Sequence, residues 1–255
     1  MDIVVGLLVA VCVFAGGMAG LQLYRLLPPH HLTTETREVV RLGINMISIL
    51  AALVLGLLTA SAKGQFDRTD QQLRSYAADI TVLDQTLRQL GPQAEPIRQD
   101  LLQYTDSAVR TTWPDQGLVQ RQPLESKSQG KLLEGIPGKL LSLLPQTDNQ
   151  HWLRAQALDV SGRLIQTRWM MLVNQRGTIS PLLVVIVVTW ITLIFASFGL
   201  DAPRNATVVA AFLVCSLSIG TSVFLILEID SPFDGIMMVS GEPMQAALAH
   251  LRAPT

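Results

Sequence analysis

The sequence predicts an all-α polytopic membrane protein with four transmembrane helices in two hairpins and a helical soluble domain between helices 2 and 3. Three observations carry this prediction. Hydrophobic residues make up 49% of the 255 residues. Four long segments are almost free of charge, and residues 63–176 between the second and third hold 14 of the 19 Lys and Arg. The formal net charge of -1 provides no general basic footprint, which argues against nucleic-acid binding.

The four apolar segments are each long enough to cross the hydrocarbon layer, which takes about 20 helical residues. They are residues 3–24, 39–62, 181–200 and 207–227, with Arg41 as the one charge among them. Lipid offers the backbone no hydrogen-bond partners, so these runs must be helical. Tight packing is expected for the first span, which carries small residues at Gly16, Gly17 and Gly20.

The connections between the spans predict their pairing. Residues 25–38 join the first two spans and residues 201–206 join the last two, where Arg204 and Asn205 are expected to cap the fourth span. We therefore expect a hairpin at 1–62, a water-facing domain at 63–177, a second hairpin at 178–228 and a C-terminal tail at 229–255. Six basic residues flank the middle domain against four on the opposite side, which predicts that the middle domain and both termini are cytoplasmic.

The middle domain opens with a heptad pattern. Its apolar positions alternate in steps of three and four: Leu73, Tyr76, Ile80, Leu83, Leu87 and Leu90. This spacing predicts a helix that packs against other helices, continuous with the second span and ended by Gly91-Pro92. Further helices are expected after Pro96 and from about 149 to 175, which gives a bundle of three or four helices.

The sequence carries no motif for nucleotide binding, nucleophilic catalysis or zinc hydrolysis, so no enzyme and no cofactor are predicted. His30 and His31 lie near Glu35, and a carboxylate-histidine metal site there is one interpretation. The other is an interfacial loop whose acids favour a helix N-terminus. We favour the second and predict no metal.

A polar stripe runs along the second span and provides the candidate functional residues. At about 100° per residue, they fall within an arc of about 80°. The stripe consists of Arg41, Asn45, Ser48, Ala52, Gly56, Thr59 and Lys63. One interpretation is close helix packing through small residues. The other is a water-lined path in a ring of copies, with Arg41 and Lys63 as positive rings that favour anions.

Several segments resemble the bacterial bestrophin-like membrane family. They are LPPHHL at 27–32, RLG at 41–43, LVLGLL at 53–58, QTRW at 166–169, FASFGL at 195–200, APRNAT at 202–207, FLILE at 224–228 and SPF at 231–233. The resemblance implies kinship with bestrophins, which are pentameric anion channels with four membrane helices per subunit and a pore lined by the second. It also implies a neck of bulky side chains, whereas the stripe here is small and polar. The acidic run that follows the Pro-Phe segment in animal bestrophins is missing here, so calcium gating is not predicted.

The patterns and the resemblance together predict a homo-oligomer in the lipid bilayer that passes inorganic anions through a pore lined by residues 39–62. The resemblance implies that the oligomer is a pentamer and that the membrane is a bacterial inner membrane. The alternative is a non-conducting membrane scaffold or sensor that recruits a partner through the seam at residues 73–90. Charge exchange at Lys63 separates a pore from a packing surface.

Overall fold

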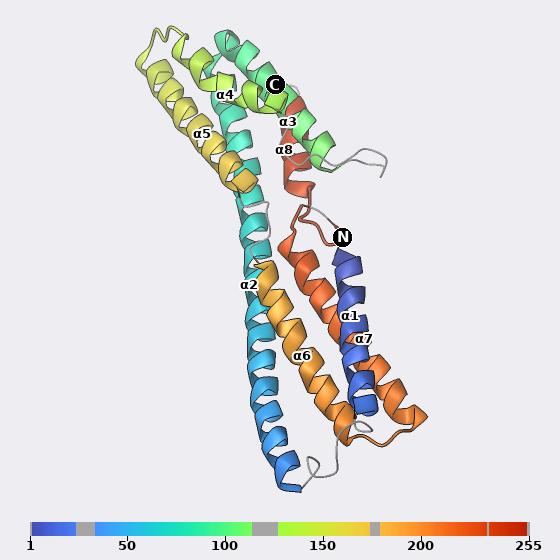
Figure 1. The fold of residues 1–255 in the computed structure, drawn as a ribbon. Helices are drawn as coiled ribbons and strands as arrows, with labels where there is room; N and C mark the ends of the chain where they lie inside the picture. The colour runs from blue at the N-terminus through green and yellow to red at the C-terminus, as the bar shows by residue number, and fades with distance from the viewer. Residues whose placement is uncertain (1, 24–33, 114–126, 174–178, 234, 254–255) are drawn as a thin grey trace. The chain divides into compact units, whose positions relative to one another are not determined.

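The computed structural model describes residues 2–23, 34–113, 127–173, 179–233 and 235–253, and its regular elements in these ranges are all helical. They are α1 (Asp2–Leu23), α2 (Thr34–Leu90), the 3-10 turn η2 (Pro92–Ala94), α3 (Glu95–Thr112), α4 (Lys127–Leu141), α5 (Asp148–Val173), α6 (Pro181–Asp201), α7 (Ala206–Asp230) and α8 (Glu242–Arg252) (Figure 1). Two compact units are present. The membrane unit is Met1–Gln65 with Gly177–Asp230, and the helical bundle is Phe66–Arg176 with Ser231–Thr255.

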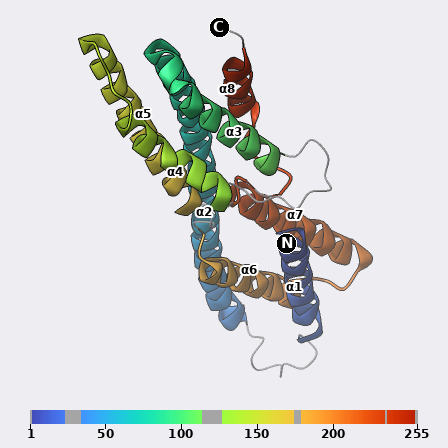
Figure 2. The ribbon, with the colours of Figure 1, turned by 90° about the horizontal axis from the view of Figure 1, so that it is seen from above.

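Four helices in the described ranges are long and apolar enough to span a membrane, which confirms the predicted number of spans. They are α1, α6, α7 and the N-terminal part of α2. The third predicted span, 181–200, and the observed α6 differ by one residue at one end. Within the membrane unit, α1 packs against both α6 and α7 (Figures 1 and 2). The pairing of α1 with α2 as a hairpin stays a prediction.

Glycines bring α1 into close contact with its neighbours. A Cβ placed on Gly20 would lie 2.0 Å from the Ala196 carbonyl oxygen of α6. A Cβ on Gly16 would lie 2.7 Å from the Thr192 side chain, also on α6, and one on Gly17 would lie 2.9 Å from the Phe212 ring of α7. The small residues of α1 therefore let its backbone approach two helices at once, as small residues do in membrane helix pairs.

The connection between α6 and α7 caps two helices. Asn205 Oδ1 accepts a hydrogen bond from Val208 N at 2.9 Å, so it is the N-cap of α7. Arg204 has a different role from the expected one, because Nε and Nη2 donate to the Leu21 carbonyl at 3.2 and 2.7 Å. It thus satisfies a carbonyl in the last turn of α1, where cations stabilise a helix end.

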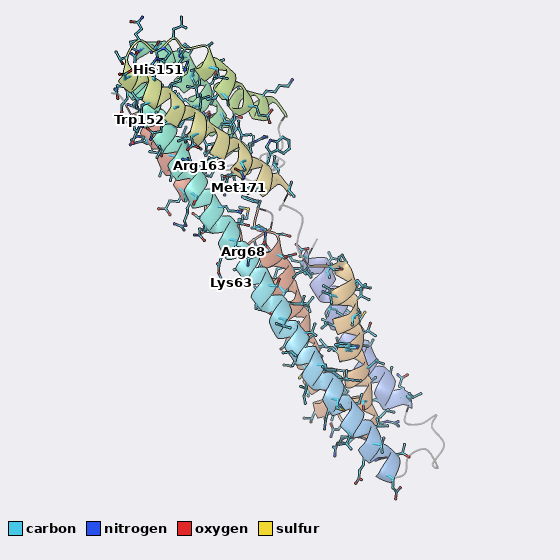
Figure 3. The ribbon with its side chains drawn as sticks, turned by 90° about the vertical axis from the view of Figure 1, so that its left-hand side faces the viewer. Lys63, Arg68, His151, Trp152, Arg163 and Met171 are labelled. Carbon is cyan, nitrogen blue, oxygen red and sulfur yellow. The ribbon has the colours of Figure 1, made fainter. Side chains whose placement is uncertain are left out.

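The core of the bundle forms around the predicted seam. All six seam side chains on α2 are at most 2% exposed. They pack with buried side chains of α3, α4, α5 and α8, among them Leu101, Leu133, Leu164 and Leu248. Arg163 of α5 (Figure 3) donates to Asp79 of α2 at 3.1 Å on the surface of this bundle. Because its own chain covers the seam, the seam is not available to recruit a partner.

Two elements of the bundle have no counterpart in the sequence prediction. The α4 helix has Pro137 in its interior and lies in a segment rich in Gly and Pro. The α8 helix lies in the predicted tail and joins the bundle core through Met244, Ala247, Leu248 and Leu251.

A buried carboxylate secures α8. Asp84 is fully buried and accepts hydrogen bonds from Arg88 Nε and Arg98 Nε, each at 2.7 Å. The two guanidinium groups also donate to carbonyls at the end of α8, Arg88 to His250 at 3.1 Å and Arg98 to Leu251 at 2.8 Å. Asp84 thereby orients two arginines that cap the C-terminus of α8.

Candidate functional site

The membrane part of α2 has one face that packs within the chain. Ala51, Leu58 and Ala62 are buried there, and Ile44 and Ile47 are partly buried beside them. They join a core with apolar side chains of α1, α6 and α7. This face identifies the side of α2 that is turned toward its own protomer.

The predicted polar stripe lies on a different side of α2. Ser48 is half-buried, and the other six stripe residues are exposed: Arg41, Asn45, Ala52, Gly56, Thr59 and Lys63. At about 100° per residue, the centre of the stripe is about 110° around the helix from the centre of the buried face. The stripe is therefore not directed into the core of the protomer.

Gly56, the glycine of the stripe, does not bring α2 close to another helix of the described residues. A Cβ added to Gly56 would meet no atom of the described residues within 4 Å, whereas one added to Gly20 would collide with α6. Within one chain, the small residues of α1 serve close helix packing and Gly56 does not. Packing through this part of the stripe would require a second copy.

The hydroxyl groups in the stripe have backbone partners. Ser48 Oγ donates to the Ile44 carbonyl and Thr59 Oγ1 to the Leu55 carbonyl, both at 2.8 Å. Such bonds within a helix satisfy the hydroxyl protons in an apolar medium. The stripe is thus weakly polar and uncharged along most of its length, and its only charged residues are Arg41 and Lys63. Figure 3 shows Lys63 on α2.

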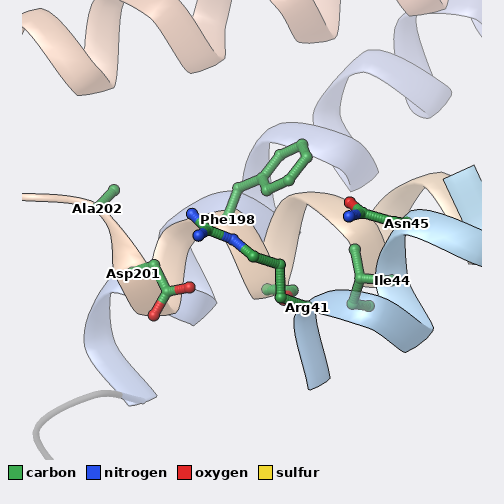
Figure 4. Close-up of a pocket in the computed structure, with 7 residues that line it drawn as sticks. Arg41, Ile44, Asn45, Phe198, Asp201 and Ala202 are labelled. Carbon is green, nitrogen blue, oxygen red and sulfur yellow. The ribbon is translucent and has the colours of Figure 1, made fainter. Parts of the chain in front are cut away.

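A cavity of about 230 Å³ lies at the Arg41 end of the stripe. Arg41, Ile44 and Asn45 of α2 line one side of it, and the last turn of α6 lines the other. Figure 4 shows the Arg41 side chain extending toward Phe198 and Asp201. The sequence pattern did not single out these two neighbours, although the short 201–206 connection indicates that the end of α6 lies near the membrane surface.

A third face of α2 is apolar and exposed. Its bulky side chains are Leu42, Met46, Ile49, Leu53 and Leu57, with exposed fractions of 59–71%. Only 6% of the most apolar window of α2 is buried, against 39% for α1. The membrane part of α2 therefore has two uncovered faces, one polar and one bulky.

The weak metal candidates do not form a described site. His30 and His31 lie outside the described residues, and Glu35 is exposed near the start of α2. In the described ranges no three His, Cys, Asp or Glu side chains are grouped to hold a metal ion.

Comparison with known proteins identifies the family. The Bestrophin-like domain model matches residues 11–244. Crystal structures of a bacterial bestrophin homologue from Klebsiella pneumoniae have similar folds. One variant has a TM-score of 0.65 at 14% identity, covering 96% of this chain and 97% of the other. Another structure, phased with zinc, has a TM-score of 0.63 at 12% identity and covers 96% of both chains. The comparison with curated proteins gives no match. Because the family model covers most of the sequence, the chain belongs to the bestrophin-like family.

Proposed function

We propose that this protein is the subunit of a homo-oligomeric, anion-permeable membrane channel whose pore is lined by copies of α2. The observation that carries the proposal is the uncovered polar stripe of α2, where a Cβ on Gly56 would meet no described neighbour. The fold shared with a bacterial bestrophin homologue supports the same conclusion. By that kinship, the oligomer is a pentamer.

The energetic argument concerns what covers the stripe. Polar and charged side chains on a lipid-facing surface are costly, so they face other helices or water-filled cavities. A ring of copies with α2 nearest the axis provides a water-filled space for all of them. The alternative is direct contact between two copies along this face, which also covers the stripe but encloses no water.

The spacing of the two cations fits the mouths of a pore. Arg41 and Lys63 are 22 positions apart, which at 1.5 Å per residue is about 33 Å. This is close to the ~30 Å thickness of the hydrocarbon layer. In a ring, each residue type would form a ring of positive charge near one membrane surface, and such rings favour anions over cations.

Chloride flux from liposomes tests conduction and selectivity together. Wild-type protein should release chloride, and Lys63→Glu should reduce chloride flux and raise sodium flux while the oligomer keeps its size. Lys131→Glu is the matched control, because Lys131 is an exposed lysine of α4 outside the membrane unit. Absence of flux from a folded, inserted oligomer would refute the channel. Equal effects of the two substitutions would refute a pore mouth at Lys63.

A cysteine accessibility experiment decides which uncovered face of α2 lines the pore. Thr59 lies on the polar stripe and Leu57 on the bulky face, and both are exposed. The background is Cys12→Ala with Cys215→Ala, since both native cysteines are exposed on the protomer. A charged, water-soluble thiol reagent should block flux through the Thr59→Cys variant and leave Leu57→Cys unchanged. The reverse pattern would assign the pore to the bulky face.

We further propose that the protein lies in a bacterial inner membrane, which its similarity to a bacterial bestrophin homologue supports. The excess of basic residues beside the bundle supports a cytoplasmic position for the bundle. The scaffold alternative loses its proposed docking surface, because the seam side chains are buried in their own bundle. A recruiting role would need another surface.

A further inference from the structure

A second cavity, of about 440 Å³, lies at the end of the membrane unit where α1 and α6 finish. Its walls include the side chains of Arg37 from α2 and Arg204 from the α6–α7 connection, together with Asp201 and the apolar Leu21 and Leu200. The volume is within the range of about 300–1,000 Å³ typical of small-molecule sites. It exceeds what one small oxyanion fills, and it suits a phosphate with a substituent attached.

The charges around this cavity favour an anion. Arg37 and Arg204 outnumber Asp201, and the adjoining Arg41 cavity shares Asp201 as well. Arg37 Nη1 is 3.8 Å from Asp201 Oδ1, and these side chains are 41% and 43% exposed. An ion pair this long and this hydrated contributes little stability. A phosphate can therefore compete with this carboxylate for Arg37.

Arg204 is already oriented for binding. Two of its nitrogens donate to the same carbonyl, that of Leu21, at 3.2 and 2.7 Å. The guanidinium plane is thereby fixed against the end of α1 before any ligand arrives. A preoriented guanidinium loses little side-chain freedom on binding, and its planar set of donors matches the geometry of a phosphate.

The position of the cavity indicates the source of the phosphate. Two apolar spans end beside it, at Leu23 and Asp201, so it lies where the hydrocarbon layer gives way to headgroups. Leu21 and Leu200 offer apolar contacts next to the two arginines. We propose that this cavity binds the phosphate of an anionic phospholipid headgroup through Arg37 and Arg204. The site does not depend on conduction by the oligomer.

Native mass spectrometry of the delipidated full-length oligomer measures binding directly. The probes are phosphatidylglycerol, phosphatidylcholine and inorganic phosphate. Phosphatidylglycerol should bind more tightly than phosphatidylcholine, and Arg37→Gln should weaken phosphatidylglycerol binding at least tenfold. The control is Arg110→Gln, whose side chain is 72% exposed on α3 and lines neither cavity; it should change nothing.

A gain in affinity provides a test that misfolding cannot imitate. Asp201→Asn removes the competing carboxylate, so it should tighten phosphatidylglycerol binding severalfold. Unchanged lipid affinity in both Arg37→Gln and Asp201→Asn would overturn the proposal. Binding of inorganic phosphate with the same dependence on Arg37, without selective lipid binding, would overturn the lipid as the source. Neither readout involves flux, so this site and the channel can fail independently.

Discussion

Loss of the Asp84 carboxylate should release α8 from the bundle. Asp84 is fully buried, while its partners Arg88 and Arg98 are 18% and 19% exposed. Asp84→Ala removes two charge-assisted hydrogen bonds of 2.7 Å and leaves two guanidinium groups without the carboxylate that orients them. Removal of one partner of a buried ion pair lowers the free energy of unfolding by about 3–5 kcal/mol. Because both arginines can hydrate in part, we expect the lower end, about 3 kcal/mol.

Hydrogen exchange of the α8 amides is the suitable assay, since it reports local opening as well as global unfolding. At about 1.4 kcal/mol per factor of ten, the loss corresponds to exchange roughly 100-fold faster in Glu242–Arg252. Asp70→Ala is the matched control. It breaks the Arg74–Asp70 pair, in which the arginine side chain is 63% exposed, so solvent screens the pair and the exchange of the α8 amides should change little. Equal exchange in the two variants would refute the role assigned to Asp84.

Two further predictions concern packing and ionisation. Gly20→Leu should lower the thermal stability of the membrane unit strongly, because its Cβ would lie 2.0 Å from the Ala196 carbonyl oxygen. Gly56→Ala should leave the folded chain intact, because no described atom lies within 4 Å of the added Cβ. Similar melting temperatures for the two variants would contradict this prediction. The Tyr76 and Tyr104 hydroxyls are 2.5 Å apart, and burial raises the pKa of both, that of Tyr76 well above its ordinary value. Their contribution to stability should therefore be complete below about pH 10 and decline as the pH rises further. Phenolate absorbance in the folded protein should show that these two tyrosines ionise at a higher pH than free tyrosine. Ionisation at the pH of free tyrosine would refute this prediction.

The sequence was sufficient to predict elements that depend on local pattern. Hydropathy located the spans because a bilayer requires apolar helices of a set length. The heptad spacing located the buried seam from Leu73 to Leu90, since its side chains must share one helix face. The sequence also predicts where a helix ends when Gly or Pro occurs there. Gly91 is an example, because its φ of 86° is a conformation that glycine adopts readily.

The sequence does not predict which helices pack against one another. All four spans are apolar, so hydropathy gives no reason for α1 to pack on both α6 and α7. The docking of α8 depends on Asp84, Arg88 and Arg98, which are separated from it by more than 140 residues and look like ordinary surface charges in the sequence. The cavity lined by Arg37 and Arg204 likewise requires the ends of α1, α2 and α6 to meet.

The two parts of α2 differ in what stabilises them, and this difference bears on function. The seam part is held by side chains of its own chain, so substitutions there should unfold the bundle. The membrane part is buried on one face only, and an apolar medium keeps its backbone helical without further packing. We therefore expect that residues such as Gly56 and Thr59 can be substituted without unfolding the chain. In the proposed channel, the identity of these residues would depend on their contacts with water, ions or a second copy. A surface with that freedom is where a channel can vary its selectivity while its fold remains the same.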